Sequence, residues 1–209
     1  MPGKSKKKLE MITVALIPFA VAINFVGYFL SSSLKLPMYL DSIGTFIVAA
    51  TCGWLPGLIT GILTGVLEGV SYPPSMAYAI NCAACGVIIG LLSQKGWMKK
   101  FLPALGVGVI VTLASVLIST PITAYLFGGI TETGNSVVTI ALQAAGFGLI
   151  PAVIISTILT EALDKVLVAV VAFFIIKAIS DRFLSKLPLG HLYLKKSFAP
   201  SCSEAEDDD

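Results

Sequence analysis

The chain is dominated by long runs of apolar residues that contain almost no charged side chains. A helix that crosses the hydrocarbon layer of a membrane needs about 20 mostly apolar residues. Only 12% of the residues are charged, whereas the surface of a soluble domain takes about a quarter. The sequence therefore predicts an all-α fold, an integral membrane bundle of six transmembrane helices. The six expected spans are 9–31, 40–52, 55–69, 76–93, 101–127 and 160–179.

The stretch 136–158 is also apolar, but Gly146, Gly148 and Pro151 interrupt it. We expect a broken helical segment that packs on the outer side, and the alternative is a seventh span. With six spans and an internal N-terminus, only Lys35 and Lys165 of the 14 lysines and arginines lie on the outer side. The positive-inside rule favours this asymmetry, so both termini are predicted to be cytoplasmic.

The chain divides into two parts by composition. Residues 1–186 form the predicted membrane domain, whose basic start is followed by an apolar run longer than that of a signal peptide, so a retained first helix is expected. Residues 187–209 end in an acidic run and are predicted to be a disordered cytoplasmic tail.

Glycines recur every fourth residue in the third span. Such a stripe lets two helix backbones approach closely in lipid, so it predicts tight packing within this chain. Beside it, Thr60, Thr64 and Glu68 form a second row that brings a carboxylate to the outer end of the helix. The helix-packing residues are Gly57, Gly61, Gly65 and Gly69.

Acidic side chains gather in the outer half of the predicted bundle. Ionisable groups at membrane depth usually face a cavity or each other, and aromatic and amide groups at the same depth suit a small polar heterocycle. Two structural alternatives remain open: Asp41 caps the second helix, and Glu161 pairs with Lys165 one turn later. The candidate substrate-binding residues are Asp41, Glu68, Asp164, Tyr39, Tyr78 and Asn81.

Catalytic and metal motifs are missing from the sequence. The one histidine, His191, lies in the tail, and there is no phosphate-binding loop and no Ser/His/Asp grouping. Cys82 and Cys85 lie in an apolar segment without a nearby histidine, so no zinc site is expected. The net charge of +2 is too small to indicate a nucleic-acid partner. We therefore expect a binding protein without cofactor or metal rather than an enzyme.

Several stretches resemble the substrate-binding S components of energy-coupling factor transporters. They are LPMYLDSIGT at 36–45, GWLPG at 53–57, FGGIT at 127–131 and EALDK at 161–165, together with Gly61 and Gly65. The resemblance implies a six-helix protein of a bacterial cell membrane that binds a vitamin or vitamin precursor from outside. It also implies delivery by toppling in the membrane against a T component with two cytoplasmic ATPases. The first helix lacks the strict AxxxA spacing of the family, and the histidine motif of the nickel and cobalt branch is absent.

The charge of the outer half predicts the charge of the solute. That half has no arginine, and its acids outnumber Lys35 and Lys165, whereas a buried anion needs cationic donors. We expect a neutral or cationic solute, such as an aminopyrimidine, a pyridoxine-like or a thiamine-like compound, over folate, biotin or pantothenate. The alternative functions are a membrane sensory module, for which no signalling domain follows the last span, and a self-sufficient secondary transporter, for which no inverted repeat is found.

Overall fold

The computed structural model describes the backbone of residues 3–131 and 133–194, with side chains from residue 11 onward. These residues form helices and turns and no β-strand, so the all-α prediction is confirmed for them. The helices are α1 (Gly3–Leu34), α2 (Ile43–Cys52), α3 (Trp54–Ser71), α4 (Ala79–Gln94), α5 (Phe101–Pro121), α6 (Asn135–Ala144), α7 (Leu149–Ala178) and α8 (Asp181–Leu184). Short 3-10 turns cover Pro73–Tyr78, Trp97–Lys99 and Gly190–Leu192, and the π-turn Ile122–Leu126 extends α5.

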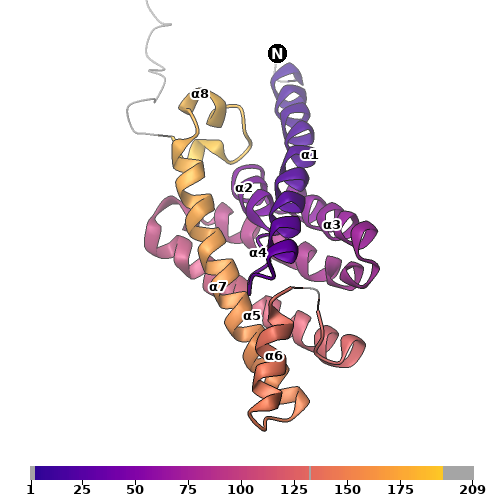
Figure 1. The fold of residues 1–209 in the computed structure, drawn as a ribbon. Coiled ribbons are helices and arrows are strands. Elements are labelled where there is room, and N and C mark those ends of the chain that lie inside the picture. The colour runs from indigo at the N-terminus through magenta and orange to yellow at the C-terminus, as the bar shows by residue number, and fades with distance from the viewer. Residues whose placement is uncertain (1–2, 132, 195–209) are drawn as a thin grey trace, which may run out of the picture.

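Helices α1 and α7 run along the length of the molecule, and the other helices pack between and beside them (Figure 1). The start of α1 and the short helix α8 lie at one end, whereas α6 and the start of α7 lie at the other (Figure 1). Four helical segments of the described chain are long and apolar enough to cross a membrane: Met11–Leu34, Trp54–Ser71, Pro73–Gln94 and Phe101–Leu126.

The remaining two predicted spans differ from these four. Helix α2 has 10 residues, which corresponds to about 15 Å, half the thickness of the hydrocarbon layer. Helix α7 has 30 residues and is long enough, but Glu161, Asp164 and Lys165 lie near its middle. Length and composition therefore indicate a helical membrane protein, but they do not establish that the chain crosses the membrane six times.

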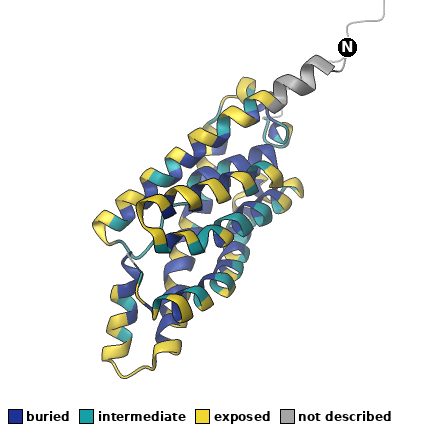
Figure 2. Ribbon diagram, turned by 90° about the vertical axis from the view of Figure 1, so that its right-hand side faces the viewer, coloured by how far each residue is buried: buried dark blue, intermediate teal, exposed yellow. Residues whose placement is uncertain are grey.

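Large apolar side chains cover the outside of the bundle. Exposed residues follow the outer faces of the helices in Figure 2, and they include Phe19 and Phe29 on α1 and Leu113 and Leu117 on α5. The buried interior is lined instead by small and medium side chains together with many hydroxyl groups. This arrangement is expected where lipid rather than water contacts the surface, because an apolar exterior then has no hydration cost.

The glycine stripe of α3 lies against α4. A side chain at Gly57 would place its Cβ 2.7 Å from the carbonyl oxygen of Gly86. At Gly61 the Cβ would lie 2.6 Å from the carbonyl carbon of Cys82, and at Gly65 it would lie 2.6 Å from the Cβ of Ala79. Gly69, at the end of the stripe, meets the side chain of Met76 before α4 begins. The two backbones are therefore in close contact from Gly57 to Gly65.

The predicted break in the apolar stretch 136–158 is present at Gly146 and Gly148, but Pro151 does not interrupt a helix. The structure ends α6 at Ala144 and begins α7 at Leu149, and α7 then continues without interruption through the expected gap before residue 160. Gly146 has a φ of 96°, which favours glycine and makes the turn. Pro151 lies in the first turn of α7, where its missing N–H has no helical partner to lose. It therefore marks the start of a helix, although the sequence analysis treated it as an interruption.

Part of the predicted tail is folded back onto the bundle. The N–H of Leu189 donates to the carbonyl of Thr51 at 2.9 Å, and the hydroxyl of Tyr193 donates to the carbonyl of Ala50 at 3.1 Å. Leu184 and Leu187 are buried beside them. We call residues 184–194 the C-terminal strap, which links the end of α7 to the end of α2. The rest of the predicted tail, 195–209, lies outside the described residues.

Candidate functional site

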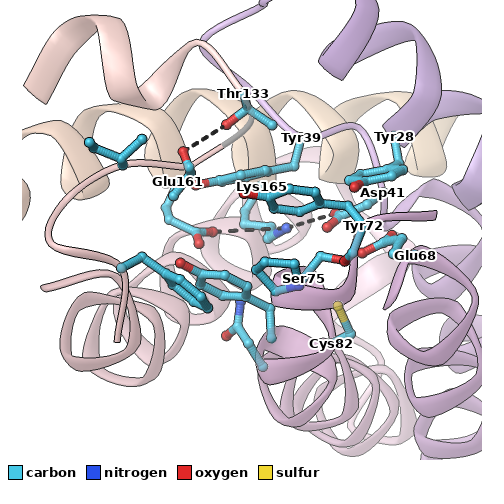
Figure 3. Close-up of a pocket in the computed structure, with 16 residues that line it drawn as sticks. Tyr28, Tyr39, Asp41, Glu68, Tyr72, Ser75, Cys82, Thr133, Glu161 and Lys165 are labelled. Atoms are coloured by element: carbon cyan, nitrogen blue, oxygen red, sulfur yellow. Dashed lines mark hydrogen bonds and ion pairs between the residues drawn. The ribbon is translucent and has the colours of Figure 1, made fainter. Parts of the chain in front are cut away.

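A cavity opens where the segment between α1 and α2 meets the ends of α3 and α5, the start of α4 and the middle of α7. It contains about 590 Å³ of space free of atoms, its open mouth included. Figure 3 shows its lining. The residues are Tyr28, Tyr39, Asp41, Glu68, Tyr72, Pro74, Ser75, Tyr78, Asn81, Cys82, Phe127, Ile130, Thr131, Thr133, Glu161 and Lys165.

The cavity brings together residues that are far apart in the sequence. The predicted substrate-binding residues in its wall are Tyr39, Asp41, Glu68, Tyr78 and Asn81. The sixth, Asp164, is fully buried and does not line the cavity.

Asp164 instead fixes the segment between α1 and α2. Its Oδ1 accepts the backbone N–H groups of Tyr39 at 3.1 Å and Leu40 at 2.7 Å. Its Oδ2 accepts a hydrogen bond from Lys165 at 2.7 Å. Leu40 has a φ of 55°, a strained value for a side chain of this size, so this part of the chain needs such an anchor. The carboxylate therefore positions Tyr39 and Asp41 in the cavity wall.

Lys165 is the one cation in the lining and is 2% exposed. Its Nζ lies 3.2 Å from Asp41, 2.7 Å from Asp164 and 3.9 Å from Glu161. The pairing of Glu161 with Lys165 is thus the longest of the three, although the i, i+4 spacing suggested it first. The N-cap residue of α2 is Ser42 rather than Asp41, and it makes no side-chain cap hydrogen bond. The Ser42 hydroxyl donates to Asp41 at 2.8 Å, and Ser42 in turn accepts from Lys165.

Three buried oxygen atoms in the cavity wall lack a hydrogen-bond partner within the described chain: Oε1 of Glu68, Oδ1 of Asn81 and Oε2 of Glu161. The other oxygen of Glu161 accepts from Ser119 at 3.1 Å. All three unpartnered atoms are acceptors, and leaving such atoms unmatched in a buried site is costly. A solute with N–H groups or a positive charge would satisfy them, whereas an anion would not.

Aromatic rings supply the apolar part of the wall. Tyr78 and Phe127 are stacked, with ring centroids 5.8 Å apart, and the Tyr78 hydroxyl is hydrogen bonded to Thr123 at 2.8 Å. Lys165 lies over the ring of Tyr39 with its Nζ 5.9 Å from the centroid. These flat surfaces are suited to a planar ring.

Several lining residues were not predicted from the sequence. Glu161 was interpreted as the partner of Lys165, and Cys82 was considered as a zinc ligand and excluded. Thr131 and Thr133 lie in a loop, and no periodic pattern points to them. The apolar character of Pro74 and Ile130 gave no signal either, because both residue types are common throughout the chain.

The comparisons with known proteins add no assignment. Scans of the chain against protein-family models, curated proteins and solved structures gave no match. The functional interpretation therefore depends on the cavity and on the residues that line it.

Proposed function

We propose that this chain is a membrane-embedded substrate-capture subunit that binds a small polar solute in the cavity, as the S component of an energy-coupling factor importer. The observation that carries the proposal is the cavity itself, with its carboxylates, stacked rings and unpartnered acceptors. It is further supported by three of the stretches that resemble S components, 36–45, 127–131 and 161–165, because each contributes residues to the wall. The role is binding, not catalysis.

The solute we expect is neutral or cationic and carries N–H donors on a planar ring. Thiamine, pyridoxine and a free aminopyrimidine are suitable probes, with folate as the anionic comparison. Isothermal titration of the purified protein, with EDTA present to remove metal ions, should detect binding of thiamine, pyridoxine or the aminopyrimidine. Changing Glu161→Gln should weaken that binding by about 10- to 100-fold, because it removes a charged acceptor from the wall.

A matched control is Asp181→Asn, the same chemical change on α8 and outside the cavity, and it should leave binding unaltered. Tight binding of folate that neither Glu161→Gln nor Asp41→Asn diminishes would contradict the charge argument. If none of the probes binds, capture of a compound from this class is ruled out.

Energy for import would come from partners, because the sequence contains no phosphate-binding loop. We expect no uptake by the chain alone and ATP-dependent uptake when a T component and two cytoplasmic ATPases are supplied. Uptake into vesicles that contain only this chain, driven by an ion gradient, would support a secondary transporter instead. Folding of the protein without any uptake in either system would favour the sensory alternative.

The topology that we propose has six crossings with both termini in the cytoplasm of a bacterial cell. The second crossing would combine α2 with the non-helical segment before it, which is possible because that backbone lines the cavity and is bound by Asp164. Helix α7 would form the last crossing, with α6 on the outer side. Reporter fusions at residues 35, 95 and 133 and at the C-terminus should report outside, inside, outside and inside. An external C-terminus would exclude six crossings.

A further inference from the structure

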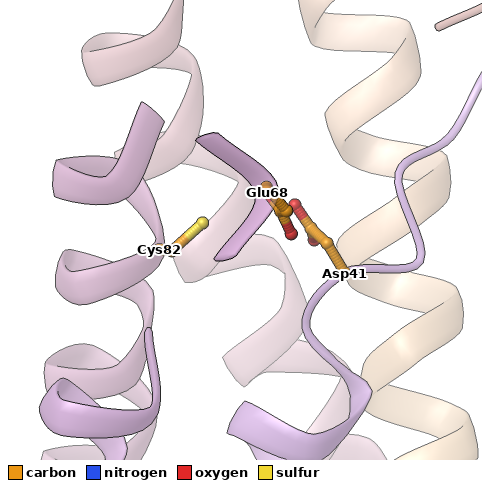
Figure 4. A group of neighbouring side chains, drawn as sticks. All are labelled: Asp41, Glu68 and Cys82. Atoms are coloured by element: carbon orange, nitrogen blue, oxygen red, sulfur yellow. The ribbon is translucent and has the colours of Figure 1, made fainter. Parts of the chain in front are cut away.

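Three side chains from three different elements converge in the wall of the cavity (Figure 4). Asp41 comes from the segment before α2, Glu68 from the last turns of α3 and Cys82 from the first turn of α4. One ligand atom of each lies within 4.8 Å of the others. The second cysteine of α4, Cys85, is not part of this group: its Sγ is in the core and lies 3.2 Å from the Ser115 hydroxyl.

Glu68 is the member of this group whose environment is incomplete. It is 3% exposed, and its Oε1 is buried without a partner in the described chain. Lys165, the nearest cation in the wall, has three N–H groups, and its Nζ donates to Asp41, Ser42 and Asp164. No donor of Lys165 remains for Glu68. Burying a carboxylate without a compensating charge is costly, so a cation bound here from outside the chain would stabilise Glu68.

The donor types identify which cation fits. Carboxylate oxygens alone would suit calcium or magnesium, but a cysteine sulfur favours a borderline transition metal such as Zn²⁺ or Co²⁺. A substrate ammonium group would gain little from the sulfur, which is a weak hydrogen-bond acceptor. Asp41 can also bind the metal ion, because Lys165 and Ser42 both donate to its Oδ1 and leave its Oδ2 for the metal.

We propose that Asp41, Glu68 and Cys82 bind a divalent transition-metal ion in the wall of the cavity, with Zn²⁺ as the best match. Three protein ligands leave a fourth position of a tetrahedral site for water or for an atom of the solute. The ion would neutralise Glu68 and the thiolate of Cys82, while Glu161, separated from Glu68 by Lys165 in the wall (Figure 3), still requires a donor. The metal site does not depend on the proposed import function.

Cobalt provides a direct test, because a Co²⁺–thiolate bond gives a charge-transfer absorption band in the near ultraviolet. The purified full chain, stripped with EDTA and dialysed, should develop this band on titration with Co²⁺ and saturate at one ion per chain. Added Zn²⁺ should abolish the band. Cys82→Ser should eliminate it, whereas Cys85→Ser, the matched control in the same helix, should retain it.

Glu68→Gln provides the second test and should weaken Co²⁺ binding by at least about 10-fold in equilibrium dialysis. The melting temperature of each metal-free variant should match that of the metal-free wild type, which separates lost binding from lost folding. Absence of the band in the wild type, or its persistence in Cys82→Ser, would overturn the proposal. Solute binding is measured separately, by titration in EDTA without added metal. Absence of metal binding and absence of solute binding are therefore distinguishable results.

Discussion

Helices α3 and α4 contribute in opposite ways to the interface between them and to the cavity beyond its end. Along the interface, Gly57, Gly61 and Gly65 bring the backbones so close that a single Cβ would clash. At its end, Glu68 and Asn81 are buried with acceptors that no residue of the described chain satisfies. The helices associate through backbone contact and need no polar side chain for it. The polar groups at the end are therefore available for a ligand.

This division predicts that stability and binding respond to different residues. Substitutions at the glycine stripe should impair folding. Substitutions of Asp164, which holds the segment before α2, or of its partner Lys165 should impair folding too. Substitutions at unpartnered acceptors should alter binding with little cost in stability.

Gly61→Leu should have the largest effect, because its side chain would displace the backbone of Cys82. Overpacking typically costs about 1–3 kcal/mol and occasionally more. Here the obstructing atoms belong to the backbone, so we expect a loss near the upper end and little folded protein. Size-exclusion chromatography and thermal unfolding in detergent would measure this. Val66→Leu, on the exposed face of the same helix, is the control and should behave as wild type. A Gly61→Leu variant with normal yield and melting temperature would refute the packed interface.

Lys165→Met should rank second, because it leaves Asp41 and Asp164 without their cation in a buried site. Breaking one side of a buried ion pair costs about 3–5 kcal/mol. The double variant Lys165→Met/Asp164→Asn should recover part of this loss, since one of the uncompensated charges is then gone. Lys177→Met, an exposed lysine of the same helix, is the control. Equal unfolding temperatures for the wild type and Lys165→Met would show that Lys165 does not stabilise the buried carboxylates of Asp41 and Asp164.

Much of this fold could be predicted because lipid imposes simple patterns on sequence. The runs at 55–69, 76–93 and 101–127 match α3, α4 with its preceding turn, and α5 with its π-turn. Apolar length and glycine spacing are local properties, so they can be counted along the chain. The helix boundary near Pro151 was misplaced because proline is equally compatible with a break and with a first turn, and only the turn at Gly146 distinguishes the two.

The site was less predictable because it depends on long-range contacts. Sequence spacing suggested that Glu161 pairs with Lys165 and that Asp164 is free for a solute. The structure has Asp164 bound to backbone amides about 125 positions earlier in the chain. Glu161 does pair with Lys165, at 3.9 Å, but its Oε2 accepts no hydrogen bond from the described residues. Likewise, the two carboxylates beside Cys82, those of Asp41 and Glu68, come from outside its own helix. No helical periodicity contains that information.

Asp164 was predicted to bind the solute but holds the backbone, whereas Glu161 was predicted to be structural but lines the cavity. This exchange of roles gives the third prediction. Asp164→Asn should lower the free energy of unfolding by about 2 kcal/mol, because hydrogen bonds to a charged group lose strength when the charge is removed. Glu161→Gln should change that free energy little, because one oxygen of Glu161 is unpartnered and the amide can keep the contact to Ser119. Thermal unfolding of the two variants side by side would compare them. A larger loss for Glu161→Gln would mean that the structural and binding acids have been assigned the wrong way round.

The smallest effect is expected in the C-terminal strap, at the end of α7 away from the cavity. Burial raises the pKa of Tyr193 to about 12, so its hydroxyl stays protonated at cellular pH and donates to the carbonyl of Ala50. Tyr193→Phe removes only this hydrogen bond and should cost about 1 kcal/mol, a fall of about 2–4 °C in melting temperature for a chain of this size. Tyr193→Ala also removes the ring that packs on the core and should cost about 3 kcal/mol. Solute affinity should be unaltered in both variants, because Tyr193 is not in the cavity wall. If Tyr193→Phe instead weakened solute binding and left the melting temperature unchanged, the strap would be coupled to the cavity through α2, and stability and binding would not be separable at this end of the bundle.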